Sequence, residues 1–377
     1  MKKIQINEPK ITQKDIATVV STLKDNSVST YGNEKQLLEE YFSDDANLIS
    51  CLAVNSGSQA LNTALCVAKK VIFSNQKIKV ATSDFTFVAT VNAIKSSGLD
   101  YDLLPCNFDF CDIDFDALTV MHKNYELFVI SLPLGDLTPI TKEVLEFLNT
   151  KKRYFIIDAA ASILLDFTQI LKMKYCLGIT LSFNGNKVIT AGGGGIIMSA
   201  YPRMIEHARN YSNQYRIGPY VHEDYGFNVG LPAINCSLAL SQINRIDEIR
   251  QEKFNIYSKY QYKFAWLNKR DYGWRFREIP NAPENASFWI FSLTQTRINP
   301  VLEENAILGI LEKHGLPSSK FWRNMHEQPF QQHDKSPRNF FKKPRVIALP
   351  SSNLPTNFFK DEMKNFMKEL KREFSNV

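Results

Sequence analysis

The chain has 377 residues, too many for one small core and enough for two domains. Hydrophobic residues make up 44% and charged residues 22%, so the composition is that of an ordinary globular protein and excludes a disordered chain. Lysine and arginine outnumber aspartate and glutamate by 45 to 39, an excess that suits an anionic ligand but lacks the long basic blocks of a nucleic-acid binder.

Cysteine usage and hydropathy limit the environment further. The six cysteines are scattered without a CxxC pair, which argues against a zinc site or a disulfide framework and fits a reduced cytoplasm. No segment has the roughly 20 consecutive apolar residues that a membrane helix needs. The first residues are charged but have no apolar stretch behind them, so they do not resemble a signal peptide. We expect a soluble cytoplasmic protein without a metal site, a nucleic-acid partner or membrane insertion.

Strand-like and helix-like segments alternate along the first half of the chain. Thr12 is a predicted N-cap, and further helices are expected after Ser56, over residues 90–95 and from Pro139 to residue 148. Strands that alternate with helices and are apolar on both faces indicate a mainly parallel sheet covered on two sides, which is an α/β fold. The predicted strands cover residues 52–54, 78–81, 100–105, 127–132, 155–158, 179–183 and 196–199.

The pattern changes in the last third of the chain. A long helix is predicted from about residue 232 to residue 267, and strand-like segments follow at residues 289–293 and 346–349. A final helix carries an apolar face made of Met363, Phe366, Met367 and Leu370. We therefore predict a large domain over residues 1–245 and a smaller C-terminal α+β domain over residues 246–377.

Lys187 is the strongest chemical signal. It follows the predicted strand 179–183, and four glycines at residues 192–195 come soon after it. A lysine in an apolar setting can lose its proton and act as an amine nucleophile that forms a Schiff base. Asp158 ends another apolar run, where a carboxylate is costly unless a cation such as a protonated pyridine nitrogen meets it. One amine and one isolated carboxylate suggest pyridoxal 5′-phosphate as the cofactor.

A phosphate site is expected where a strand leads into a helix. The segment at residues 56–59 presents free backbone amides at a helix N-terminus, which favours an anion, although it could also be a simple N-cap. Ser182 could add a hydroxyl group, or could be an ordinary serine at a strand end. Phe87 could lie over a planar cofactor, although most of the 26 phenylalanines belong to the core.

Together these segments resemble the DegT/DnrJ/EryC1/StrS family, the nucleotide-sugar aminotransferases with the fold type I architecture of aspartate aminotransferase. The resemblance covers nearly the whole chain and implies a mainly parallel seven-stranded sheet flanked by helices, with a smaller C-terminal α+β domain. The matching segments are residues 55–61, 85–90, 158–160, 182–187 and 226–243.

The resemblance also implies a role for each matching residue. Lys187 would hold pyridoxal phosphate as a Schiff base, Asp158 would hold the ring nitrogen, and Phe87 would stack on the ring. Asn228 would reach the cofactor phosphate of the neighbouring subunit, which implies a homodimer with shared active sites. The residues expected around the phosphate within one subunit are Gly57, Ser58, Gln59 and Ser182.

Three positions depart from the family's pattern. Ala161 stands where the family usually has a glutamine that bonds the cofactor hydroxyl or packs on the ring, so we expect that hydroxyl to rely on water or another residue. Gly230 stands where the family has an arginine, and we expect the freed space to admit a bulkier substrate substituent. Ile157 replaces an acidic residue.

Two residues are candidate substrate contacts. His326 lies in the segment 322–329, which resembles the family's segment close to the sugar, although a lone histidine is more often structural. Tyr31, in the break after the first helix, is the second candidate.

The resemblance implies an aminotransferase that moves an amino group from glutamate to the keto group of a nucleotide-linked, often deoxygenated, sugar for surface polysaccharides such as O-antigen, or for other glycoconjugates. Two alternatives keep the fold: a nucleotide-sugar dehydratase, whose family members carry histidine in place of the Schiff-base lysine, and a non-catalytic sensor that binds the cofactor. A nucleotide-binding α/β protein without this cofactor would leave Lys187 and Asp158 together unexplained.

Overall fold

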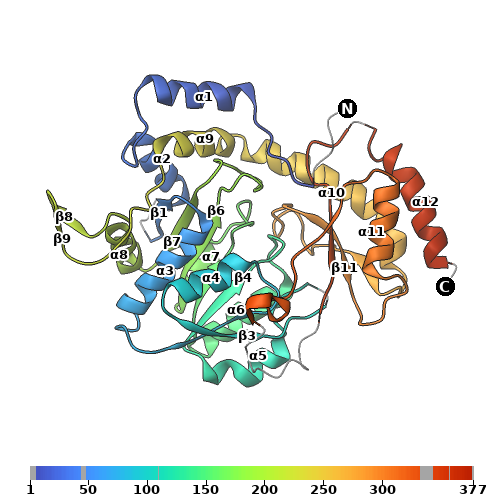
Figure 1. Cartoon of the computed structure of the whole chain (residues 1–377), viewed down its shortest axis with the longest axis horizontal. Coiled ribbons are helices and arrows are strands. Elements are labelled where there is room, and N and C mark those ends of the chain that lie inside the picture. Colours follow the sequence, from blue (N-terminus) through green and yellow to red (C-terminus); the bar gives the residue numbers. More distant parts are fainter. Residues whose placement is uncertain (1–5, 44–47, 109, 332–342, 356, 376–377) are drawn as a thin grey trace.

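A seven-stranded sheet with helices on both faces forms the first part of the molecule (Figure 1). The structure is a computed structural model that describes residues 6–43, 48–108, 110–331, 343–355 and 357–375. The strand order is β1-β7-β6-β5-β4-β2-β3, and within this sheet β7 runs antiparallel to both of its neighbours. The predicted mainly parallel sheet is confirmed. Its strands are β1 (Ser50–Val54), β2 (Lys79–Ser83), β3 (Asp100–Leu104), β4 (Leu127–Ser131), β5 (Tyr154–Asp158), β6 (Cys176–Ser182) and β7 (Gly195–Ser199).

Both faces of this sheet are buried, because successive residues of a strand belong to different cores. In β5, Phe155 and Ile157 pack into one hydrophobic core, whereas Ile156 between them packs into a second core on the other face. This explains why the strands read as continuous apolar runs. The helices of this part are α1 (Gln13–Lys24), α2 (Asn33–Phe42), α3 (Gly57–Val71), α4 (Val88–Ser96), α5 (Phe115–Met121), α6 (Pro139–Thr150), α7 (Thr168–Leu171) and α8 (Pro202–Ser212), with the 3₁₀ turn η1 (His122–Asn124).

A four-stranded antiparallel sheet forms the smaller C-terminal part, as expected for an α+β unit. Its order is β10-β11-β13-β12. The boundary after residue 245 stays a prediction. The N-terminal segment lies beside this second sheet, since Ser351 N–H donates to the carbonyl oxygen of Ile6 at 2.7 Å. The elements are β10 (Trp274–Phe276), β11 (Phe291–Gln295), α11 (Glu304–Lys313), β12 (Ser319–Lys320), η2 (Met325–Glu327), η3 (Pro329–Gln331), β13 (Val346–Leu349) and α12 (Glu362–Ser375).

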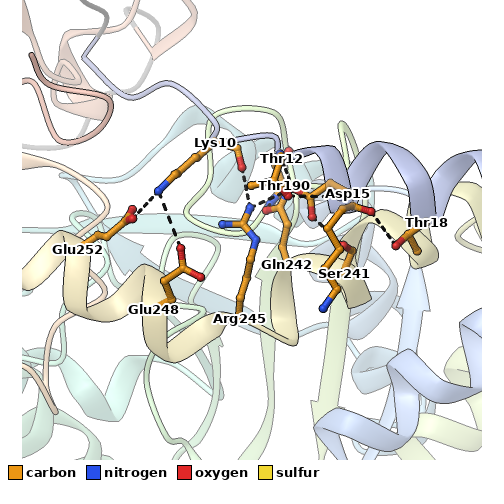
Figure 2. Close-up of polar contacts among 11 residues, drawn as sticks. Lys10, Thr12, Asp15, Thr18, Thr190, Ser241, Gln242, Arg245, Glu248 and Glu252 are labelled. Carbon is orange, nitrogen blue, oxygen red and sulfur yellow. Dashed lines mark hydrogen bonds and ion pairs between the residues drawn. The ribbon is translucent and has the colours of Figure 1, made fainter.

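The prediction of one long helix over residues 232–267 is wrong. The chain forms two helices, α9 (Ala233–Ile243) and α10 (Ile246–Asn268), with an interruption at Asn244 and Arg245. There the Arg245 guanidinium donates to the carbonyl oxygen of Lys10 at 2.7 Å and to the Asp15 carboxylate at 3.0 Å (Figure 2). Asp15, in α1, also accepts a bond from Ser241 in α9 at 2.7 Å (Figure 2). Contacts with the N-terminal segment therefore accompany the interruption, where the sequence has neither glycine nor proline.

Several elements were absent from the sequence prediction, among them α2, α8 and a short hairpin. The hairpin consists of β8 (Arg216–Gly218) and β9 (Val221–His222) and projects from the body beyond α8 (Figure 1). It exposes the side chains of Ile217 and Tyr220. No helix in the described part of the chain is both long and apolar enough to cross a membrane.

Candidate active site

A cavity of about 280 Å³ lies at the carboxyl ends of the parallel strands. Ser131, Asp158 and Ser182, the last residues of β4, β5 and β6, form one part of its wall, and Trp289 and Trp322 from the C-terminal part form another. The carboxyl edge of a parallel sheet is where α/β proteins bind ligands. Six of the ten predicted site residues line this cavity: Gly57, Ser58, Phe87, Asp158, Ser182 and Lys187.

Lys187 lies in the loop between β6 and β7, and its position is set by backbone and aromatic contacts. Its N–H donates to the carbonyl oxygen of Asn184 at 2.9 Å, and its Nζ lies 3.8 Å from the centroid of the Trp289 ring. Burial lowers the pKa of Lys187 to about 8, although the charge of Asp158 opposes this shift. The amine can therefore exchange a proton near neutral pH, as a nucleophile or a general base requires.

Asp158 is held by two hydrogen bonds at the end of β5. The Thr90 hydroxyl donates to Oδ2 at 2.7 Å, and the backbone N–H of Ala160 donates to Oδ1 at 3.3 Å. Burial raises the pKa of Asp158, whereas these two donors and the charge of Lys187 oppose the rise. The carboxylate is thus oriented into the cavity and is stabilised in its ionised form by a nearby cation.

The first turn of α3 lines one end of the cavity. The side chain of Ser56 caps the helix by accepting from the N–H of Gln59 at 3.1 Å, so that amide is already used. The amides of Gly57 and Ser58 come earlier in the turn, where no helical partner exists, and such groups favour an anion. A Cβ atom on Gly57 would lie 2.6 Å from the Cβ of Ser182, so only glycine allows this approach of α3 to β6.

These groups fit pyridoxal phosphate. The cavity offers the N-terminal amides of α3 and the Ser182 hydroxyl for a phosphate, the Asp158 carboxylate for a protonated ring nitrogen, and the Lys187 amine for the aldehyde. The three kinds of group belong to different segments that the fold brings to one sheet edge. Within the described residues no cluster of three histidine, cysteine, aspartate or glutamate side chains could hold a metal ion.

Trp289, Trp322 and Thr90 line the cavity wall but were not identified from the sequence. Trp322 packs 5.4 Å from the ring of Phe87 and 6.1 Å from that of Trp289, measured between centroids. Trp289 was expected inside a strand, but β11 begins at Phe291, so Trp289 precedes the strand and donates its indole N–H to the carbonyl oxygen of Asn186 at 2.7 Å. Its neighbour in space, residue 322, is distant in sequence, so no local pattern connects them.

Four predicted residues lie outside the cavity wall: Gln59, Asn228, Tyr31 and His326. Asn228 and Tyr31 are exposed, and the Tyr31 hydroxyl donates to the side chain of Asn213 at 2.8 Å. His326 is buried against Asp84, with 2.6 Å between Nδ1 and Oδ2. This contact ties η2 to the residue that follows β2, which is a structural arrangement in the single subunit. The functional roles of these four residues stay predictions.

The expectation of free space at Gly230 is wrong. Gly230 is buried and pairs with Val54, the last residue of β1. A Cβ atom there would lie 3.1 Å from the Cβ of Thr30 and 3.4 Å from the Nζ of Lys35. Gly230 does not line the cavity, whereas Ala161 does. The two departures from the family's pattern therefore have different surroundings.

Known proteins similar to this chain are sugar aminotransferases and their relatives. The EpsN protein of Bacillus subtilis strain 168, whose name assigns it as a pyridoxal phosphate-dependent aminotransferase, is 26% identical over 399 residues, which cover 100% of this chain and 97% of EpsN. GDP-perosamine synthase of Escherichia coli O157:H7 is 25% identical over 271 residues, which cover 69% of this chain and 71% of that enzyme. The structure of PseC from Helicobacter pylori, an aminotransferase involved in the biosynthesis of pseudoaminic acid, has a TM-score of 0.82 at 19% identity and covers 100% of both chains.

The family itself also matches over most of the chain. A model of the DegT/DnrJ/EryC1/StrS aminotransferase family matches residues 9–357, which include every segment that forms the cavity. The fold and the cofactor that the sequence predicted agree with this match. The chain therefore belongs to the DegT/DnrJ/EryC1/StrS aminotransferase family and has pyridoxal 5′-phosphate as its cofactor.

Proposed function

We propose that this sugar aminotransferase moves an amino group from glutamate to the keto group of a nucleotide-linked sugar, and that the product is used for a surface polysaccharide or another glycoconjugate. The observation that carries the proposal is the presence of the Lys187 amine and the Asp158 carboxylate in one cavity with the first turn of α3. The name of GDP-perosamine synthase supports a nucleotide-linked sugar as the substrate.

The residues of the chain bind the cofactor and move protons. When bound, pyridoxal phosphate supplies an electron sink for the bond that is broken at the amine-bearing carbon. The first turn of α3 and Ser182 would hold its phosphate, and Asp158, oriented by Thr90, would pair with the ring nitrogen and keep it protonated. The Nζ of Lys187, with a pKa of about 8, moves the proton between the amine-bearing carbon and the C4′ carbon of the cofactor.

Aromatic side chains form part of the cavity wall. Phe87 and Trp322 pack together at the wall of the cavity, and Trp289 lies against the amine of Lys187. Aromatic rings can also pack on the apolar face of a sugar. A nucleotide-sugar dehydratase would share the fold, but the retained Lys187 supports amino transfer, because the dehydratases of the family carry histidine there.

The proposed assembly is a homodimer in which Asn228 completes the partner's phosphate site. In the single subunit Asn228 is exposed, and so are Tyr220, Tyr225 and Phe227, whose exposed fractions are 97%, 94% and 62%. Exposed aromatic side chains gathered on one projecting segment are typical of a protein–protein interface. A second copy of the chain would cover them.

Two absorbance measurements test the proposed reaction. The purified protein should acquire a visible band with pyridoxal phosphate, and glutamate should bleach it while 2-oxoglutarate is released. Keto sugars linked to GDP, UDP or dTDP should then restore the band when the correct one is added. A band that glutamate leaves unchanged, while other amino acids bleach it, would refute glutamate as the donor. Sugar deoxygenation without net consumption of glutamate would indicate the dehydratase.

A further inference from the structure

Ser131 is a polar group of the cavity that the mechanism above does not use. It is the last residue of β4, its exposed fraction is 7%, and it lines the cavity. Within the described structure its Oγ has no hydrogen-bond partner. Buried hydroxyl groups are almost always paired, because an unpaired one loses its hydrogen bond to water without replacement. Because Ser131 also lines the cavity, its Oγ is available to a polar atom of a bound ligand.

The order of the strands in the sheet indicates which part of the ligand lies near Ser131. Strands β4 and β6 flank β5 on opposite sides. Ser131 is the register partner of Asp158, so the two side chains point to the same face of the sheet. Ser182 ends β6 on the other flank, next to Gly57 in the first turn of α3. Along the sheet edge from β6 to β4, the order is therefore the phosphate site at Ser182, the carboxylate of Asp158 and the hydroxyl of Ser131.

Pyridoxal phosphate has a matching arrangement of groups. On one side of its ring nitrogen lies the edge with the phosphate-bearing arm, and on the other side lies the edge with the ring hydroxyl. With the nitrogen at Asp158 and the phosphate on the β6 side, the hydroxyl edge faces the β4 side. Ala161 also lies on this side, since a Cβ atom on Gly135, in the turn after β4, would meet the carbonyl oxygen of Ala161 at 2.6 Å. Ala161 has only a methyl group and cannot make a hydrogen bond with its side chain.

We propose that the hydroxyl group of Ser131 donates a hydrogen bond to the ring hydroxyl oxygen of bound pyridoxal phosphate and replaces the side-chain amide that is absent at Ala161. The inference rests on the proposed binding mode, in which Asp158 holds the ring nitrogen. Ser131 is then a cofactor-binding residue that fixes the rotation of the ring in its plane. The described residues of the cavity wall include two charged side chains, Asp158 and Lys187. Both are kept in all variants described below.

The test compares Ser131→Ala with a matched control, Ser162→Ala. Ser162 is also buried, with an exposed fraction of 0% and no hydrogen-bond partner for its Oγ among the described residues, but it does not line the cavity. Apoprotein of each variant is titrated with pyridoxal phosphate, and the pH midpoint of the visible band is measured. A hydrogen bond donated to the ring oxygen lowers the affinity of this oxygen for the proton that it shares with the nitrogen of Lys187. Loss of this bond in Ser131→Ala should therefore raise the pH midpoint of the visible band by about half to one pH unit. Its cofactor affinity should fall about three- to tenfold, and Ser162→Ala should match the wild type in both.

A second pair of variants separates the hydrogen bond from the shape of the cavity. Ser131→Thr keeps the hydroxyl and should keep the wild-type midpoint. In Ser131→Ala combined with Ala161→Gln, the new amide should return the midpoint at least halfway toward the wild-type value. Thermal unfolding of the apoproteins shows whether each variant is folded.

The outcomes distinguish this inference from the proposed function. If the wild type shows the visible band but Ser131→Ala has the same midpoint and affinity as Ser162→Ala, the contact with the ring hydroxyl is overturned and the proposed function stands. If Ser131→Thr shifts the midpoint as much as Ser131→Ala does, the contact is overturned as well. If the wild type forms no band with pyridoxal phosphate, both the contact with the ring hydroxyl and the proposed function are overturned.

Discussion

Replacement of Gly230 by arginine, the residue that the family's pattern has there, should destabilise this protein. The position is closely packed, because a Cβ atom would lie 3.1 Å from the Cβ of Thr30 and 3.4 Å from the Nζ of Lys35. Lys35 is already near another cation: its pKa is lowered mainly by burial, the charge of Glu39 opposes this, and Arg209 adds to it. An arginine at residue 230 would bring a further positive charge into this partly buried cluster.

The expected loss follows from packing and charge. Displacement of well-packed neighbours costs about 1–3 kcal/mol. A guanidinium about 5 Å from the Lys35 ammonium adds about 3 kcal/mol at an effective dielectric constant of about 20. Glu39, whose Oε1 lies 3.9 Å from the Nζ of Lys35, offsets part of the repulsion. We expect a net loss of about 3 kcal/mol in the free energy of unfolding and a melting temperature several degrees lower.

Thermal unfolding and steady-state kinetics check this prediction together. The loss of stability should shrink as the pH rises, because the pKa of Lys35 is lowered in the folded state and the repulsion disappears when its amine becomes neutral. Lys35→Met in the Gly230→Arg background should recover the charge part at neutral pH. Gly309→Arg is the control, since Gly309 is exposed in α11 and a Cβ atom there would have no atom of the described residues within 4 Å.

The same substitution should lower kcat/KM. Gly230 pairs with Val54, and the N–H of Asn55 donates to the carbonyl oxygen of Val229 at 2.8 Å, so a shift there moves the segment that leads into α3. A Gly230→Arg variant as stable as the wild type and more active would refute the reasoning and would identify Gly230 as a degraded arginine position.

Three further predictions concern the cofactor site and the assembly. Lys187→Ala should abolish transamination without a change in the circular dichroism spectrum, since its amine is also the proton carrier; turnover close to the wild-type rate would exclude this role. Asp158→Asn should slow the half-reaction with glutamate at least about a hundredfold, because the ring nitrogen loses its counter-charge; unchanged stopped-flow kinetics would leave Asp158 as a core residue. Light scattering should give a dimer. A remixed preparation of Lys187→Ala and Asn228→Ala subunits should regain about a quarter of the wild-type activity, because half of the dimers contain one intact site out of two. A mixture no more active than the separate variants would contradict a shared site.

Local patterns in the sequence were sufficient for much of the fold and for the centre of the site. The seven strands of the large sheet were expected within a few residues of their observed bounds, since each is a short apolar run that needs only burial on two faces. Thr12 and Ser56 both cap helices, as predicted, because their side chains accept bonds from backbone N–H groups of the first turn. Lys187 and Asp158 stand out because an amine and a carboxylate are costly in apolar surroundings unless they have a chemical role.

Local reasoning does not reach contacts between segments that are distant in sequence. The contact of His326 with Asp84 joins segments more than two hundred residues apart, and its predicted place near the sugar stays a prediction. Gln59 belongs to the matching segment, yet the Ser56 cap uses its amide and its side chain stays outside the cavity wall. For Asn228 a single subunit cannot supply the partner's phosphate site that it is expected to reach, and the substrate contact of Tyr31 stays a prediction.

The sequence by itself thus determined the α/β class, the order of the large sheet's strands along the chain, and the pair Lys187 and Asp158, because periodicity, capping and the cost of buried charge act over a few residues. Only the tertiary structure decided where the long helix is interrupted at Arg245 and which tryptophan rings line the cavity. It also decided that the hydroxyl of Ser131, beside Asp158, has no hydrogen-bond partner in the described part of the chain. These features depend on which distant segments pack together, and a local pattern carries no information about that choice.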